Sequence, residues 1–371
     1  MTTSSPDART HDRPTLAVVG ATGRFARALV AAMALHDDPW GEIRLLSPRL
    51  TTSTLPVRGR EQQIDVLTEH SFDGVDIALL NLPTDQTRPW SRRAVAAGAT
   101  VVDASGAHRL DDDVPLVVPG INDAALAHRP TGVVAIPGPI TWALVDAAHV
   151  LHRAWELQLL TVTGLIAADS RAEGGVSRLR SELSALADTP KAGLSPGDVR
   201  AATSDLPPTS PFPAPLGMNV IPWVGRPAGD GWTTAERALE AEIRKILDIP
   251  HVPVIATLVQ VPVVSAHSMS IHARLARPVH PDKVARVFTE APALVVVDTP
   301  VGGEVPTPVD VVGIDPRFVG RIRQPEGLRH NVELFLSSDT VRRGAGAMLD
   351  IAGQLAGTGH RRDRPPVVTD R

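Results

Sequence analysis

The chain has 371 residues, which is enough for two domains with buried cores. Aromatic residues make up only 3% of it and tyrosine is absent, so the core must be largely aliphatic, which suits a parallel sheet covered by helices. The net charge of −4 excludes a general attraction to nucleic acid or anionic membranes. Because cysteine is absent, disulfides, thiolate metal sites and thiol nucleophiles are excluded.

No apolar run reaches the roughly 18 residues of a membrane span. Residues 1–14 are polar and lack the apolar core of a signal peptide. We therefore expect a cytoplasmic protein with neither a membrane partner nor a nucleic-acid partner.

The first part of the chain alternates between apolar runs and Ala/Leu-rich segments. Strands are predicted at 15–19, 42–47, 76–82 and 100–103, and helices at 25–35 and 91–97. Strands that alternate with helices predict right-handed βαβ units and a parallel sheet.

The pattern changes after about residue 150. A helix at 233–247 is indicated by its amphipathic period, by Thr233 as its cap and by Glu236 in its first turn. Residues 189–216 are rich in Pro, Ser and Gly and predict a long arm, whereas 177–182 is typical of a solvated helix face. Further strands are predicted at 159–168, 254–264, 268–276, 294–298 and 331–337, and further helices at 177–187 and 340–355. This pattern is typical of an α+β domain with an antiparallel or mixed sheet.

The loop between the first strand and the first helix has the composition of a dinucleotide-binding turn. Small residues there allow a sharp turn and let backbone N–H groups at the helix N-terminus approach a pyrophosphate. The alternative is a tight turn that binds nothing. The candidate cofactor residues in this loop are Gly20, Ala21, Thr22, Gly23, Arg24 and Phe25, with Ala26 as a third small position.

The second strand ends at Ser47, and Arg49 follows two residues later. No acid stands there to hold a ribose 2′-hydroxyl, whereas Ser47 and Arg49 could hold a 2′-phosphate. This favours NADP(H) over NAD, although NAD or no cofactor stays open. The alternative for Arg49 is a solvated side chain beside a turn.

These features predict an α/β fold: a Rossmann-type doubly wound parallel sheet followed by an α+β domain. The expected boundaries are a disordered tail at 1–14, a nucleotide-binding domain at 15–145 and the α+β domain at 146–336. A helix is expected at 337–356, and 357–371 should form a second disordered tail.

The sequence resembles the aspartate-semialdehyde dehydrogenase family over nearly its whole length, from Leu16 to about Leu355. The family's segments recur in order as GATG (20–23), DASGAHRL (103–110), VPLVVPGIN (114–122), MNVIPWVG (218–225), TTAERALEAEIRKIL (233–247), VPVVSAHSMSIHARL (261–275), FVGRIR (318–323) and SSDTVRRGAGAML (337–349). The resemblance implies the family fold, in which the α+β domain serves dimerisation and substrate binding and the helix at 337–356 returns to the first domain. It also implies an acyl-enzyme formed on a cysteine and reduced by NADPH.

The resemblance also shows where this chain departs from the family. The nucleophile position falls on Pro139, which offers neither a nucleophile nor a backbone N–H. Thr141, two residues later, is a poor substitute because its hydroxyl is unactivated. The orienting glutamine falls on Ala167, and two neighbouring glycines fall on Arg171 and Glu173.

The two cations that hold substrate anions in the family are also replaced, by Gln260 and Ala238. Two family positions are retained. His267 matches the catalytic acid/base and Arg109 matches a phosphate-binding arginine, although His267 could be a packed structural histidine and Arg109 could cap a turn. No histidine has a spacing to carboxylates that predicts a metal site.

Three functional hypotheses follow. The first is a pseudoenzyme that binds a nucleotide or a partner, as a homodimer or as a heterodimer with a related dehydrogenase. The second is an active NADP-dependent oxidoreductase that reduces a carbonyl by direct hydride transfer with His267 as proton donor. The third is a structural subunit that binds no cofactor. The loss of several roles together favours the first hypothesis.

Overall fold

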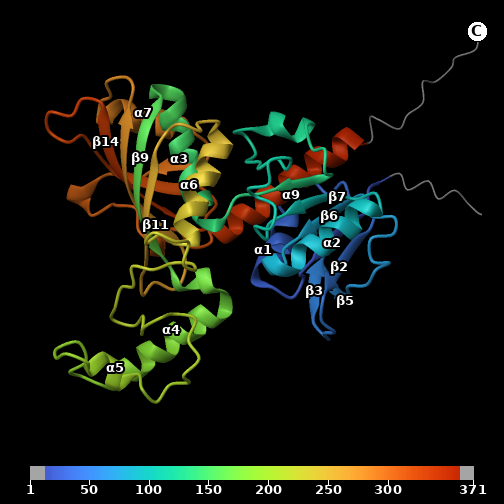
Figure 1. The fold of residues 1–371 in the computed structure, drawn as a ribbon, viewed down its shortest axis with the longest axis horizontal. Coiled ribbons are helices and arrows are strands. Elements are labelled where there is room, and N and C mark those ends of the chain that lie inside the picture. Colours follow the sequence, from blue (N-terminus) through green and yellow to red (C-terminus); the bar gives the residue numbers. More distant parts are fainter. Residues whose placement is uncertain (1–12, 360–371) are drawn as a thin grey trace, which may run out of the picture. The chain divides into compact units, whose positions relative to one another are not determined.

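The computed structural model describes residues 13–359, which divide into two compact units (Figure 1). Unit 1 holds 13–119, 123–136 and 345–359, and unit 2 holds 120–122 and 137–344. Most of the two expected tails therefore lies outside the described residues. At the N-terminal end, the described Arg13 donates from Nε to the carbonyl oxygen of Pro39 at 3.1 Å.

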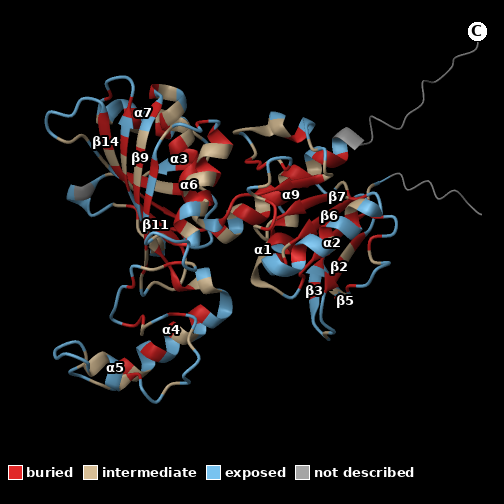
Figure 2. Ribbon diagram, in the orientation of Figure 1, coloured by how far each residue is buried: buried red, intermediate tan, exposed pale blue. Residues whose placement is uncertain are grey.

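Unit 1 is built on a six-stranded sheet whose order is β5-β2-β1-β6-β7-β8. Every pair in it is parallel, which is the doubly wound order of a Rossmann fold. Its strands are β1 (Leu16–Val19), β2 (Ile43–Ser47), β5 (Asp65–Val66), β6 (Ile77–Leu80), β7 (Thr100–Asp103) and β8 (Val133–Ala135). The central strands β1 and β6 are buried throughout, as their unbroken aliphatic runs require (Figure 2).

The remaining elements of unit 1 join or cover this sheet. They are α1 (Arg24–Met33), the hairpin β3 (Thr54–Val57) and β4 (Arg60–Gln63), α2 (Thr84–Ala96) and a 3-10 turn at Asp123–Ala127. Helix α2 begins seven residues before the predicted 91–97. It includes Pro89, a residue that normally ends a helix, so composition alone understated its length.

Unit 2 is built on a second, mixed six-stranded sheet with the order β10-β9-β11-β14-β13-β12. The strands are β9 (Leu157–Ile166), β10 (Val254–Gln260), β11 (His267–Leu275), β12 (Leu294–Val296), β13 (Arg317–Arg323) and β14 (Asn331–Ser338). The helices are α3 (Pro139–Trp155), α4 (Ala172–Ala187), α5 (Asp198–Ala202), α6 (Thr234–Leu247), α7 (Pro281–Thr289) and α8 (Pro308–Val311), with 3-10 turns at Ala168–Arg171 and Pro300–Gly302.

The predicted fold class is confirmed: one Rossmann-type sheet and one mixed sheet in an α+β unit. Helix α3 packs on β9, β11 and β14, and α6 packs on β10 and on α3. The predicted cap of α6 is present, because the Thr233 hydroxyl accepts from the Glu236 N–H and the Glu236 carboxylate accepts from the Thr233 N–H.

The last helix, α9 (Thr340–Gly359), belongs to unit 1 from Ala345 onward. Within unit 1, Asp350 on α9 lies 3.3 Å from Nε2 of His36, and Gln354 donates to Asp123 at 2.9 Å. These contacts support the proposed return of the last helix to the first domain. In the described chain, no helix is both long enough and apolar enough to cross a bilayer.

The arm at 189–216 is largely irregular, as predicted, but contains the short helix α5. The expectation of a solvated face at 177–182 was wrong for Glu182, whose side chain is fully buried. Its Oε2 accepts from the N–H groups of Leu216 and Gly217 at 2.7 and 2.8 Å, and Oε1 accepts from Arg178 at 2.6 Å. The end of the arm is thus tied to helix α4 by a buried carboxylate.

Candidate functional site

In unit 1 the glycine loop leaves β1 in a conformation that requires glycine at its first position. Gly20 has φ of +91°, and a Cβ there would lie 2.3 Å from the carbonyl oxygen of Asn81. The N–H groups of Gly20 and Ala21 donate to the carbonyl of Leu46 in β2 at 2.9 and 3.0 Å. The fold therefore accounts for Gly20 without any ligand.

Gly23 is different, because the fold does not require glycine there. Its φ is −80°, and an added Cβ would meet only the Gly20 carbonyl oxygen, at an ordinary 3.5 Å. Gly23 is the N-cap of α1 and offers no side-chain acceptor to the N–H groups of the first turn, which also have no acceptor within the helix. Thr22 is exposed, and Arg24 and Phe25 are partly exposed. This turn has the donors that a pyrophosphate needs.

The two residues predicted to select NADP(H) lie in contrasting environments. Ser47 is 1% exposed, and its hydroxyl accepts from the Arg49 N–H at 3.2 Å, so this side chain serves the turn after β2. The Arg49 side chain is exposed, and within the described residues it has no ion pair. Arg49 is therefore the better placed of the two to meet a phosphate.

Arg109 lies in the loop that follows β7, and backbone carbonyls hold its guanidinium. Nε donates to Ile136 at 2.8 Å and Nη2 donates to Ala104 at 2.7 Å. A Cβ on Gly106 would lie 2.9 Å from Nη1, so the loop closes tightly over this side chain. These contacts match the turn-capping alternative, and a role for Arg109 in anion binding stays a prediction.

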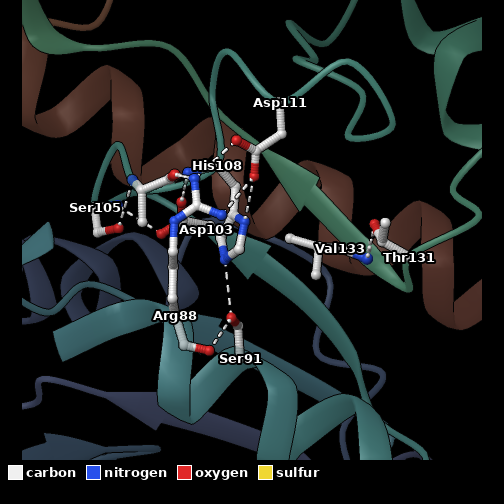
Figure 3. A network of polar contacts seen from close by, with 9 residues as sticks. Arg88, Ser91, Asp103, Ser105, His108, Asp111, Thr131 and Val133 are labelled. Atoms are coloured by element: carbon white, nitrogen blue, oxygen red, sulfur yellow. Dashed lines mark hydrogen bonds and ion pairs between the residues drawn. The ribbon is translucent and has the colours of Figure 1, made fainter. Parts of the chain in front are cut away.

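Figure 3 shows how the loop after β7 is fixed. Asp103 accepts from the N–H of Ser105 at 2.8 Å and from that of His108 at 3.3 Å. The His108 ring lies between Ser91, with Nε2 to Oγ at 2.8 Å, and Asp111, with Nδ1 to Oδ2 at 3.0 Å. Sequence reasoning missed this network, because its members come from α2, from the end of β7 and from the loop that follows it.

A serine, a histidine and an aspartate in this order resemble the triad of a hydrolase, but the surroundings indicate a structural role. Ser91 is 1% exposed, and its hydroxyl also donates to the Arg88 carbonyl at 3.0 Å within α2. Arg88 holds Asp111 from both of its terminal nitrogens, at 2.8 and 2.9 Å, and its guanidinium lowers the pKa of that carboxyl. The network joins α2 to the loop that carries Arg109.

In unit 2, Pro139 is the first residue of α3 and is exposed. Proline is favoured at this position because its missing N–H has no helical partner there. The preceding Gly138 donates its N–H to Oε2 of Glu242 on α6 at 2.7 Å, and Glu242 is 2% exposed. Thr141 is 2% exposed in the first turn. Sequence reasoning missed Glu242, although its place among Leu239, Ile243 and Ile246 on the buried face of α6 was a usable signal.

His267 opens strand β11 and is 2% exposed. Its Nδ1 accepts from the Ala167 N–H at 3.4 Å and lies 3.9 Å from Oδ1 of Asp169. Asp169 also accepts from the Ser265 hydroxyl at 2.7 Å. The residue before the histidine, Ala266, has φ of +71°, which is a costly conformation for alanine. The structure thus brings together two predicted positions, His267 and Ala167, around a ring whose other nitrogen, Nε2, carries the proton when the ring is neutral.

The other replaced positions also have identifiable surroundings. Gln260 is 1% exposed and donates its amide to the carbonyls of Ile166 and Ala167, both at 2.7 Å. Ala238 is partly exposed on α6. Arg171 is half-buried, which lowers its pKa, whereas Glu173 is exposed. Across the described residues, no group of three or more His, Asp and Glu side chains could hold a metal ion.

Comparison with known proteins gives consistent matches for both units. Residues 15–129 match the NAD-binding domain of semialdehyde dehydrogenases, and residues 151–343 match their dimerisation domain. The aspartate-semialdehyde dehydrogenase of Corynebacterium glutamicum is 32% identical over 339 residues, which is 89% of this chain and 96% of that protein. That of Streptomyces akiyoshiensis is 31% identical over 88% of this chain and 94% of that protein.

A solved structure agrees with these sequence matches. The crystal structure of aspartate semialdehyde dehydrogenase II from Vibrio cholerae superposes with a TM-score of 0.84 at 25% identity. The match covers 95% of this chain and all of that one (100%). Both units of the present fold therefore have counterparts in a single solved chain.

Proposed function

Because the chain belongs to the semialdehyde dehydrogenase family, we propose that it is a nucleotide-binding member that has lost the family's thiol chemistry. One observation carries this proposal: the 371 residues contain no cysteine. Without a thiolate no thioester can form, and the hydride acceptor of an acyl-enzyme route is missing. We therefore expect that the chain does not catalyse the phosphorylating oxidation of aspartate semialdehyde.

The surroundings of the replaced positions support the same proposal. Pro139 fits the first turn of α3 as a helix-starting residue. The amide nitrogen of Gln260 donates to two backbone carbonyls, so it is not available to bind a substrate carboxylate. The residues that stand in place of the catalytic set thus act in folding.

The glycine loop supports nucleotide binding. Gly23 and the first-turn N–H groups of α1 would hold a pyrophosphate, and Arg49 would meet a ribose phosphate, which favours NADP(H). Such a cofactor, when bound, supplies or accepts a hydride. The match of 151–343 to a dimerisation domain supports a homodimer.

Two measurements test this function. Calorimetry of the purified protein should show NADPH binding that is tighter than NADH binding and is weakened in Arg49→Ala. An assay with aspartate semialdehyde, phosphate and NADP should show no phosphate-dependent NADPH formation. Turnover in a preparation free of host enzyme would overturn the proposed loss of thiol chemistry. If no nucleotide binds, the hypothesis that remains is a structural subunit without a cofactor.

The geometry of His267 favours a second candidate, direct reduction of a carbonyl. Because Nδ1 accepts from the Ala167 N–H, a neutral ring presents a proton on Nε2. Such a reaction needs a proton donor from the protein, and His267 on β11, which is 2% exposed, is the candidate. A screen of aldehydes and ketones that follows NADPH absorbance tests it. Turnover that His267→Gln abolishes would select this candidate over a non-catalytic member.

A further inference from the structure

In the described part of unit 2, several buried polar atoms around Arg317 lack a hydrogen-bond partner; four belong to groups that can donate, and one, Oδ2 of Asp146, is an acceptor. Within the described residues, Nη1 of Arg317, Nε of Arg343, Nε1 of Trp142 and Oγ of Ser338 are all buried without a hydrogen-bond partner. Arg317, Trp142 and Ser338 are at most 1% exposed, and the Arg343 side chain is 15% exposed. Buried groups of this kind normally have partners, so four together call for an explanation.

The register of the sheet and the packing of α3 place these four residues in one neighbourhood. Phe318 pairs with Ser337 between the antiparallel strands β13 and β14, so Arg317 and Ser338 lie opposite each other one residue further along. Arg317 reaches α3, where its Nη2 donates to the Trp142 carbonyl at 2.8 Å. The Cζ atom of Arg343 lies 5.7 Å from the centre of the Trp142 ring.

The charges of this neighbourhood are only partly balanced. Asp146 places Oδ2 2.6 Å from Nη2 of Arg317, an ion pair that leaves Nη1 free. Asp315 is half exposed and lies 4.0 Å from Nη1 of Arg343, so the second arginine is weakly paired. Burial lowers the pKa of Arg317, the Asp146 carboxylate opposes this, and Arg343 adds to it. The two arginines and the two carboxylates balance formally, but Asp315 is half exposed and 4.0 Å away, so the charge of Arg343 is only weakly compensated. Arginine and indole N–H groups can only donate.

We infer that Arg317, Arg343, Trp142 and Ser338 form a binding site for an oxyanion, a carboxylate or phosphate group of a small molecule. An oxyanion supplies several acceptors in a small volume and balances the charge of Arg343. Ser338 also pairs with His267 between β14 and β11, and directly paired residues share a face of the sheet. The site therefore lies beside the retained histidine, on the face that α3 covers.

The test uses the full chain and compares sodium phosphate and sodium acetate with sodium chloride at equal ionic strength. We expect phosphate or acetate to raise the melting temperature by about 3 °C beyond chloride, since a ligand that binds only the folded state stabilises it. Ser338→Ala and Arg343→Gln should each weaken anion binding about tenfold in calorimetry. Arg342→Gln changes the exposed neighbouring arginine and should leave binding unchanged.

Arg317 itself is left in place, because its removal would strand the buried Asp146 carboxylate and could unfold the protein. Ser338→Ala removes a hydroxyl that has no partner, so without anion it should fold as well as wild type. If phosphate and acetate raise the melting temperature no more than chloride does, water satisfies these donors and the proposed anion site is wrong. So would a phosphate shift that persists in Arg343→Gln and Ser338→Ala, because the anion would then bind elsewhere, for instance at the start of α1.

Discussion

The side-chain amide nitrogen of Gln260 lies 2.7 Å from the carbonyl oxygen of Ala167, and the same nitrogen lies 2.7 Å from that of Ile166. One amide thus holds the backbone where β9 ends and the next turn begins. The position that resemblance assigns to a substrate-binding cation is here a buried structural contact.

Replacing Gln260 with methionine should therefore lower stability, since methionine has nearly the same length and no donor. Two buried carbonyls would lose a partner, and we expect the free energy of unfolding to fall by about 2 kcal/mol. Urea denaturation monitored by tryptophan fluorescence measures this. An unchanged midpoint would contradict the structural role of Gln260.

The carboxylate of Glu182 should be needed to keep the end of the 189–216 arm in place. Glu182→Ala removes the acceptor of two backbone N–H groups and of Arg178, so we expect a loss of about 3 kcal/mol. Limited proteolysis should then cut within the arm at protease levels that leave wild type intact. Glu173→Ala, at an exposed site of the same helix, serves as the control and should change neither result.

Two alanine substitutions in the glycine loop should separate folding from cofactor binding. Gly20→Ala places a methyl 2.3 Å from the Asn81 carbonyl oxygen and should lower the melting temperature sharply. Gly23→Ala adds a methyl at an ordinary contact distance of 3.5 Å from the Gly20 carbonyl oxygen, so the melting temperature should stay within about 2 °C of wild type. If a pyrophosphate binds this turn, Gly23→Ala should nevertheless weaken NADPH binding at least tenfold. Unimpaired NADPH binding in Gly23→Ala would exclude the turn as the cofactor site.

The ion pair between Arg88 and Asp111 should stabilise the folded protein near neutral pH and lose this effect at acidic pH. The hydrogen bonds from Arg88 hold the pKa of the Asp111 carboxyl below the ordinary value for aspartate, which is about 3.8. A depressed pKa gives stability that is present above that value and is lost as the pH falls through the lower pKa of the folded state. Arg88→Gln should thus cost about 1 kcal/mol at pH 6, and the cost should shrink below about pH 4. Arg92→Gln, an exposed neighbour on α2, is the control; a cost independent of pH would argue against this pairing.

Introducing a thiol alone should not create the family's activity. Pro139→Cys places the only cysteine of the chain at an exposed helix start, so one thiol should react rapidly with Ellman's reagent. We expect no phosphate-dependent NADPH formation from aspartate semialdehyde, because Ala167, Gln260 and Ala238 would still replace the other functional groups. Measurable turnover would show that the alignment of these three positions is wrong.

The sequence predicted those parts of the fold whose signals are local. Strand β7 has the predicted bounds, and the start of α6 follows from the spacing of Thr233 and Glu236. The fold class follows from the order of strands and helices. Such signals depend on neighbours within a turn or two, which a single sequence displays.

The features that sequence reasoning missed depend on distant partners. Strand β13 begins at Arg317, whose burial depends on Asp146, more than 150 residues earlier. Glu182 is buried because Leu216 and Gly217 bring their N–H groups to it. Arginine and glutamate are normally predicted to be exposed to solvent. This prediction fails wherever a residue distant in the sequence supplies the compensating charge or hydrogen-bond donor.

The proline at the start of α3 has a consequence for how this chain could change over time. Proline at that position restricts the unfolded chain and suits the first turn, so any replacement is expected to cost about 1 kcal/mol of stability. A change to cysteine would carry this cost at once, and under the proposed alignment it would bring no catalytic benefit until several other positions had also changed. The stability of the first turn of α3 alone therefore favours keeping proline at this position.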